Sequence, residues 1–82
     1  MSFFNTITNE QKIQNIDARL ISIKQQLYGA LMMAGINPET FDIATFDSEA
    51  QIDPLFAGYA TEIERLIQSC NLMEEIRQQV LG

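Results

Sequence analysis

The chain has 82 residues, of which 46% are hydrophobic and 20% are charged, and this composition predicts one small folded domain rather than a disordered chain. Eleven acidic residues against five basic ones give a net charge of −6, which argues against direct binding to nucleic acid or to an anionic membrane. The single cysteine excludes a disulfide within the chain, and no apolar run approaches the roughly 20 residues that a membrane span needs.

The cysteine and histidine contents predict the compartment of the protein and argue against an enzyme. A lone cysteine suits a reducing environment, either the cytoplasm or the inside of a virion or another assembled particle, and we expect no secretion through a signal peptide. The absence of histidine removes the commonest general base and most zinc sites, and no glycine-rich phosphate loop occurs. We therefore expect no catalytic residue, metal or cofactor, and we predict that the protein is not an enzyme.

The first predicted helix spans about residues 8–34. Apolar residues recur there every three or four positions, which is the spacing of a helix that packs along one seam. The seam consists of Ile13, Ile16, Leu20, Ile23 and Leu27. Thr8 and Gln11 have the spacing of a capping box at the start. At the end, Gly35 suits the left-handed position that closes a helix, and Ile36 is placed to pack back on the last turn.

The second predicted helix spans about residues 53–81. Asp53 is a suitable N-cap, and Pro54 follows at the first helical position, where its missing N–H costs nothing. The three-and-four spacing returns, and the seam consists of Tyr59, Ile63, Leu66, Cys70 and Met73. Because Cys70 falls on this seam, we expect a small buried core residue rather than a reactive thiol.

Residues 35–52 form a connector that is both acidic and aromatic. Asn37 and Asp47 each begin a segment with the character of a short helical turn. The candidate interaction residues of the connector are Phe41, Asp42, Phe46, Asp47 and Glu49. Two interpretations stay open. Either the rings face inward as a lid on the hairpin while the carboxylates cap helices, or the segment is a docking epitope with aromatic anchors and an acidic rim for a basic partner.

Together these segments predict an all-α fold in a single domain, residues 1–82. The architecture is an antiparallel two-helix hairpin with a partly helical connector packing on its open end. Residues 1–7 form either an extra turn or an arm, in which Phe3 and Phe4 are further candidate interaction residues. Asp17 and Glu74 would approach each other in this hairpin, so we expect solvent screening, a different register or a cation from a partner.

The apolar stripes are wider than one hairpin needs. The surplus residues are Ile21, Tyr28, Leu31, Met32 and Met33 on the first helix and Ile67, Leu72, Ile76 and Leu81 on the second. A wide stripe usually packs against a third or fourth helix, and this chain has only two long ones. We therefore predict that another chain completes a bundle, in the simplest case a four-helix homodimer.

Two classes of function follow. The first is a structural or assembly protein that acts through helix–helix packing with itself or within a larger complex, as a small virion component, a secretion-apparatus subunit or a subunit-binding chaperone does. The second is an acidic inhibitor or regulator that binds a basic surface of another protein. In both classes the expected partner is a protein, with no direct contact to nucleic acid or to a membrane.

Overall fold

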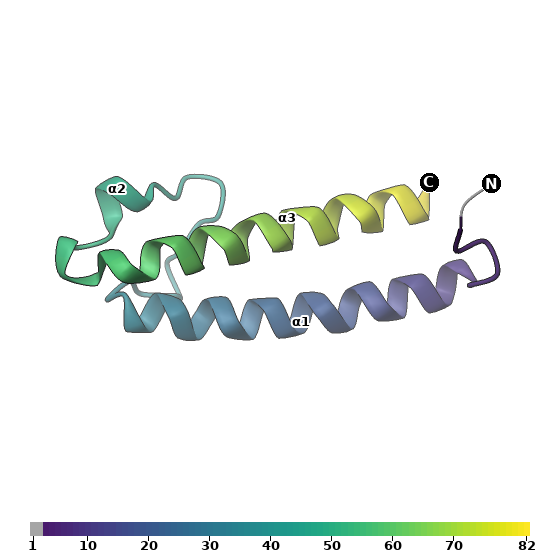
Figure 1. Cartoon of the computed structure of the whole chain (residues 1–82), viewed down its shortest axis with the longest axis horizontal. Coiled ribbons are helices and arrows are strands. Elements are labelled where there is room, and N and C mark those ends of the chain that lie inside the picture. The colour runs from purple at the N-terminus through teal and green to yellow at the C-terminus, as the bar shows by residue number, and fades with distance from the viewer. Residues whose placement is uncertain (1–2) are drawn as a thin grey trace.

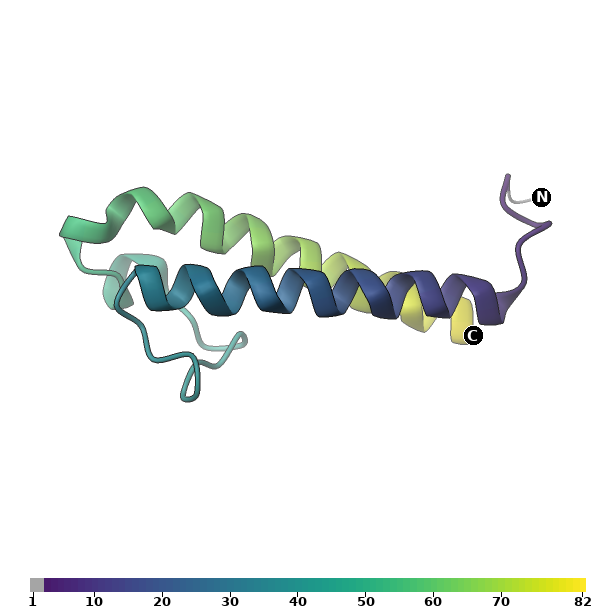
Figure 2. The ribbon, with the colours of Figure 1, turned by 90° about the horizontal axis from the view of Figure 1, so that it is seen from below.

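The computed structural model describes residues 3–82 and consists of two long antiparallel helices joined by a connector (Figure 1). Helix α1 spans Asn9–Met33, the short α2 spans Ser48–Gln51, the 3-10 helix η1 spans Pro54–Tyr59, and α3 spans Ala60–Leu81. Helices α1 and α3 pack against each other, and no strand occurs between residues 3 and 82, so the all-α prediction is confirmed. The molecule measures 48 × 20 × 19 Å, and Figure 2 shows α3 crossing α1 at a shallow angle.

Both ends of α1 are fixed by local signals in the sequence. At its start, the Thr8 hydroxyl accepts the Gln11 backbone N–H and the Gln11 side chain accepts the Thr8 N–H, each at 3.1 Å, so the capping box is present. At its end, Gly35 has a φ of +78°, and the N–H groups of Gly35 and Ile36 donate back to carbonyl oxygens of the last turn. This Schellman closure is the one that the glycine predicted.

The second helix begins differently from the prediction. Asp53 does act as a cap, because its carboxylate accepts a backbone N–H two residues on at 2.9 Å. However, Pro54–Tyr59 forms a 3-10 helix, and the α-helix begins only at Ala60. Within the 3-10 segment, Phe56 leaves helical geometry and its ring lies against Gly35, where a Cβ would sit 3.5 Å from Phe56 Cε2. The ring of Phe56 thus packs against the turn that closes α1.

The core divides into two clusters along the length of the hairpin. The connector cluster consists of Leu27, Leu31, Ala34, Ile52, Ile63 and Leu66. The smaller terminal cluster consists of Ile16, Leu20 and Cys70. The connector cluster is larger because Ile52 and the partly buried rings of Phe41 and Phe46 cover one side of it, whereas only the two helices form the terminal cluster.

The structure places the ten seam residues in or against these clusters. Six of them are buried, and Ile13, Ile23, Tyr59 and Met73 are partly buried. Three of the residues predicted to be surplus also belong to the hairpin itself, since Leu31 is buried and Ile67 and Ile76 pack partly buried against the core. The prediction of surplus apolar surface is therefore wrong for those three residues. The others, Ile21, Tyr28, Met32, Met33, Leu72 and Leu81, are exposed.

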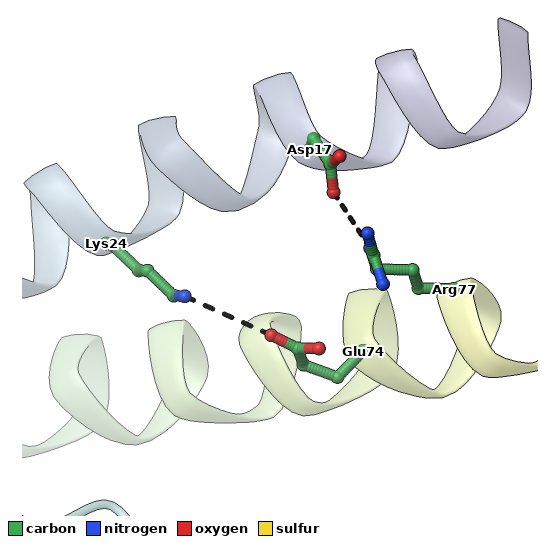
Figure 3. Close-up of polar contacts among 4 residues, drawn as sticks. All are labelled: Asp17, Lys24, Glu74 and Arg77. Carbon is green, nitrogen blue, oxygen red and sulfur yellow. Dashed lines mark hydrogen bonds and ion pairs between the residues drawn. The ribbon is translucent and has the colours of Figure 1, made fainter. Parts of the chain in front are cut away.

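Two ion pairs join the helices along one side of the hairpin (Figure 3). Arg77 Nε donates to Asp17 Oδ1 at 2.9 Å, and Lys24 Nζ lies 4.0 Å from Glu74 Oε1. Each of the two acids that were expected to repel each other thus has a cation from its own chain. The arginine and lysine side chains reach across to the neighbouring helix, so each acid is paired within its own chain (Figure 3).

Candidate interaction surfaces

The hairpin can be divided into two halves that differ in charge. The connector half comprises residues 27–68, and the terminal half comprises residues 3–26 and 69–82. The connector half holds seven carboxylates and one arginine, whereas the terminal half holds four carboxylates and four cations. The net charge of −6 therefore lies entirely in the connector half.

The aromatic rings of the connector pack inward. Phe41 and Phe46 form a tilted pair with ring centroids 5.3 Å apart, and both are partly buried against the connector cluster. Ile52, at the end of the connector, is buried in the same cluster. This is the arrangement of a lid, in which the rings cover the hairpin instead of standing out as anchors for a partner.

The acids of the connector hold its local turns. The Asp42 carboxylate accepts the Ala44 N–H at 2.9 Å, and the Asp47 carboxylate accepts the Glu49 N–H at 3.0 Å at the start of α2. The Tyr28 hydroxyl donates to Glu39 Oε1 at 2.8 Å, and this hydrogen bond, together with the negative charge of the carboxylate, raises the pKa of Tyr28. These acids are exposed, so they also give the connector its negative surface.

An acidic recess lies between the connector and α3. Its lining consists of Ile43, Phe46, Asp47, Ser48, Glu49, Glu64, Ile67 and Gln68. The Ser48 hydroxyl donates to Glu64 Oε1 and ties α2 to α3. Three carboxylates and no cation line the recess, so a basic side chain is the group that it would attract.

The terminal half carries a groove of the opposite character. This terminal groove is lined by Phe4, Ile7, Lys12, Asn15, Ile16, Ile76, Gln79 and Val80. Five of these side chains are apolar, one is a cation and none is an acid. Asn9 Nδ2 donates to the Val80 carbonyl at 3.4 Å and holds the start of α1 beside the end of α3.

The segment before α1 borders this groove. It forms a turn closed by the Ile7 N–H donating to the Phe4 carbonyl at 3.0 Å, and it lies at the same end of the molecule as the C-terminus of α3 (Figures 1 and 2). The rings of Phe3 and Phe4 meet edge to face with centroids 4.9 Å apart. Phe4 lines the groove, whereas Phe3 is 88% exposed. Met1 and Ser2 lie outside the described residues.

A third apolar surface follows one flank of α1. Ile21, Tyr28 and Met32 are exposed and stand seven and four residues apart, which places them on one face of the helix. Lys24 and Gln25 border the first two of them. We call these three residues the α1 stripe; it begins in the terminal half and continues into the connector half.

Metal-binding side chains were sought in the part of the chain that the structure describes. Between residues 3 and 82, no group of three or more histidine, cysteine or acidic side chains is placed to hold a metal ion, and the thiol of Cys70 is buried. None of the helices in that range is long and apolar enough to cross a membrane. Comparison of the chain with known protein families, curated proteins and solved structures found no match.

Sequence reasoning named some of these surface residues and missed others. Phe3 and Phe4 were named, and the structure puts them at the terminal end, apart from the candidates of the connector. The terminal groove was missed, because Ile7, Gln79 and Val80 come together only when both ends of the chain meet. The acidic character of the connector was predicted, but the equal numbers of acids and cations in the terminal half were not noted, although counting charges along the predicted hairpin would have found them.

Proposed function

We propose that this protein is a non-enzymatic structural or assembly protein that works by helix–helix packing with copies of itself or within a larger complex. The main observation that supports this proposal is the large solvent-exposed surface area of the chain. The chain exposes 6055 Å², whereas a compact monomer of 9.3 kDa exposes about 5,000 Å². Its radius of gyration is 15.3 Å, against about 12 Å for a compact domain of 82 residues. A rod of two helices leaves area that a further layer of helices would bury.

Much of the exposed surface belongs to large apolar side chains. Among residues 3–82, eleven such side chains are at least 37% exposed, namely Phe3, Phe4, Ile21, Tyr28, Met32, Met33, Ile43, Leu55, Phe56, Leu72 and Leu81. One exposed leucine is ordinary in any soluble protein. Eleven exposed large apolar side chains in a chain of 82 residues support a role in which a partner covers some of them.

The chemistry of the side chains also supports contact rather than catalysis. The chain has no histidine, and its one thiol is buried in the terminal cluster. The connector carboxylates that accept backbone N–H groups are occupied in turns and caps. This leaves few groups placed to act as a general base or a nucleophile.

A second function has its own support at the other end of the molecule. The acidic recess and the charge of −6 in the connector half suit an inhibitor or regulator that occupies a basic surface of another protein. In that role the connector half would steer the encounter, and the affinity would fall steeply with salt.

Sedimentation velocity of the pure protein, from low micromolar to near-millimolar concentration, separates the two functions. A dimer or a larger species supports assembly. A monomer at every concentration that binds a lysine-rich peptide, with an affinity that falls steeply between low and physiological salt, would replace the first function by the second. The peptide should be compared with one in which glutamine replaces each lysine, because only charge should matter to the acidic recess.

A further inference from the structure

We infer that the terminal groove is occupied by a second copy of this chain, in a twofold arrangement in which Phe3 of each copy enters the groove of the other. The acidic connector halves then point away from each other. This inference rests on the proposed assembly function and specifies both the surface and its occupant.

The first support is that the surface is complementary to itself. Phe3 is 88% exposed, and its ring lies edge to face on Phe4, which lines the groove. A projecting ring and an apolar groove thus belong to the same patch. A twofold axis through such a patch pairs each ring with the groove of the other copy, so one contact forms twice and the interface closes.

The second support is the distribution of charge. Two copies that met through their connector halves would bring seven carboxylates against seven, with one arginine on each side. The terminal half has equal numbers of acids and cations, and the groove itself holds Lys12 and no acid. With the connector halves at opposite ends of a dimer whose subunits are each 48 Å long, they lie several Debye lengths of about 8 Å apart. Their repulsion is then screened.

The third support is the area available. One chain exposes roughly 1,000 Å² more than a compact monomer of its mass, so two chains hold roughly 2,000 Å². A specific interface of standard size buries about 1,600 Å² in total. The excess of two subunits is thus larger than a standard interface, but it is spread along the whole 48 Å length of each rod, and the terminal groove supplies only part of it.

The other surfaces fit a second copy less well. The acidic recess would repel the recess of its partner. The α1 stripe runs into the connector half, where the Tyr28 hydroxyl is bonded to Glu39, so pairing through it would bring the two acidic halves closer together. A basic protein would in turn be drawn to the acidic connector half, not to the terminal groove, whose only charged lining residue is Lys12.

Sedimentation equilibrium of the full chain and two variants tests the inference. Phe3→Asp puts a carboxylate on the projecting position, and Leu55→Asp makes a matched change in the connector half, where Leu55 is 87% exposed. We expect Phe3→Asp to raise the dimer dissociation constant at least about tenfold, because two apolar contacts are lost for each dimer, and Leu55→Asp to leave it nearly unchanged. Circular dichroism should show equal helicity in all three proteins, since both positions lie in solvent.

A third variant distinguishes failure of the inference from failure of the proposed function. If Phe3→Asp remains dimeric while Ile21→Asp becomes monomeric, the copies meet through the α1 stripe; the inference is then wrong and the assembly function stands. If the unaltered chain is a monomer throughout the concentration range, the inferred dimer does not exist and the inference is wrong. The proposal that the protein assembles with copies of itself is then wrong as well.

Spin labels test the orientation of the two copies independently. In the inferred dimer, labels on Gln79→Cys lie closer together than labels on Leu55→Cys, because Gln79 lines the groove and Leu55 lies in the connector half. Buried Cys70 reacts more slowly than either introduced thiol. The reverse order of the two distances would contradict the arrangement.

Discussion

The two halves of the hairpin contain the same pair of helices but cover their apolar seam in different ways. In the connector half, Ile52 and the rings of Phe41 and Phe46 pack on five other buried side chains. In the terminal half, three buried side chains lie beside an apolar groove that the segment before α1 only borders. One half carries its own cover together with all of the net charge, and the other is neutral and open. The comparison shows that a short chain can cover its core with its own connector at one end and keep an apolar groove at its surface at the other.

Truncating one leucine in each half should have the largest effect. We expect Leu66→Ala, in the connector cluster, to lower the free energy of unfolding by about 3–5 kcal/mol, and Leu20→Ala, in the terminal cluster, by about 2–3 kcal/mol, because a cavity surrounded by more packed atoms relaxes less. Urea denaturation at one fixed protein concentration measures both values, since any dimer makes stability depend on concentration. Equal losses would mean that the connector adds nothing to the core beneath it.

Removing the two rings of the connector tests whether it is a lid. We expect Phe41→Ala combined with Phe46→Ala to cost about 2–4 kcal/mol, less than two fully buried rings because both are only partly buried. Ile43→Ala is the control within the same segment, since Ile43 is exposed and should cost less than about 1 kcal/mol. Normal stability in the double variant, with a loss of association, would favour the docking epitope instead.

The closure between α1 and the connector depends on one glycine. We expect Gly35→Ala to cost about 1–2 kcal/mol, because φ is +78° there and a Cβ disfavours that conformation. Gly29→Ala is the matched control: Gly29 lies inside α1, a Cβ there would meet no atom within 4 Å, and the change should stabilise by about 0.5–1 kcal/mol. Thermal unfolding of the two variants should therefore shift in opposite directions.

The smallest expected effect on the free energy of unfolding comes from removing one ion pair, either in the terminal half or in the connector half. Arg77→Gln removes a bond across the helices in which the arginine is 33% exposed, and we expect a loss of about 0.5–1 kcal/mol. Arg65→Gln removes a pair with Glu62 within α3, more exposed on both sides, and should cost less than about 0.5 kcal/mol. Repeating the unfolding in high salt should narrow the difference, and a larger loss at Arg65 would contradict the ranking.

Much of the fold could be predicted because its signals are local. Thr8 and Gln11 interact three residues apart, and Gly35 closes the helix through bonds to the turn before it. The 3-10 turn before Ala60 was not predicted, because Asp53 and Pro54 are start signals that do not distinguish a 3-10 helix from an α-helix, and the contact of Phe56 with Gly35 joins residues far apart in the chain. The acidic recess and the terminal groove could not be predicted, because each joins segments from different parts of the sequence, whereas the residues of the α1 stripe lie on one helix and were predicted as surplus apolar residues.

The two long helices, their caps and the seam between them follow from local patterns in the sequence, because periodicity and capping act within a few residues. The inward packing of the connector rings, the pairing of Asp17 with Arg77 and the apolar groove between the two ends of the chain became visible only in the folded molecule. These features depend on how α3 crosses α1 and on how far long side chains reach. Neither can be predicted from a pattern of neighbouring residues.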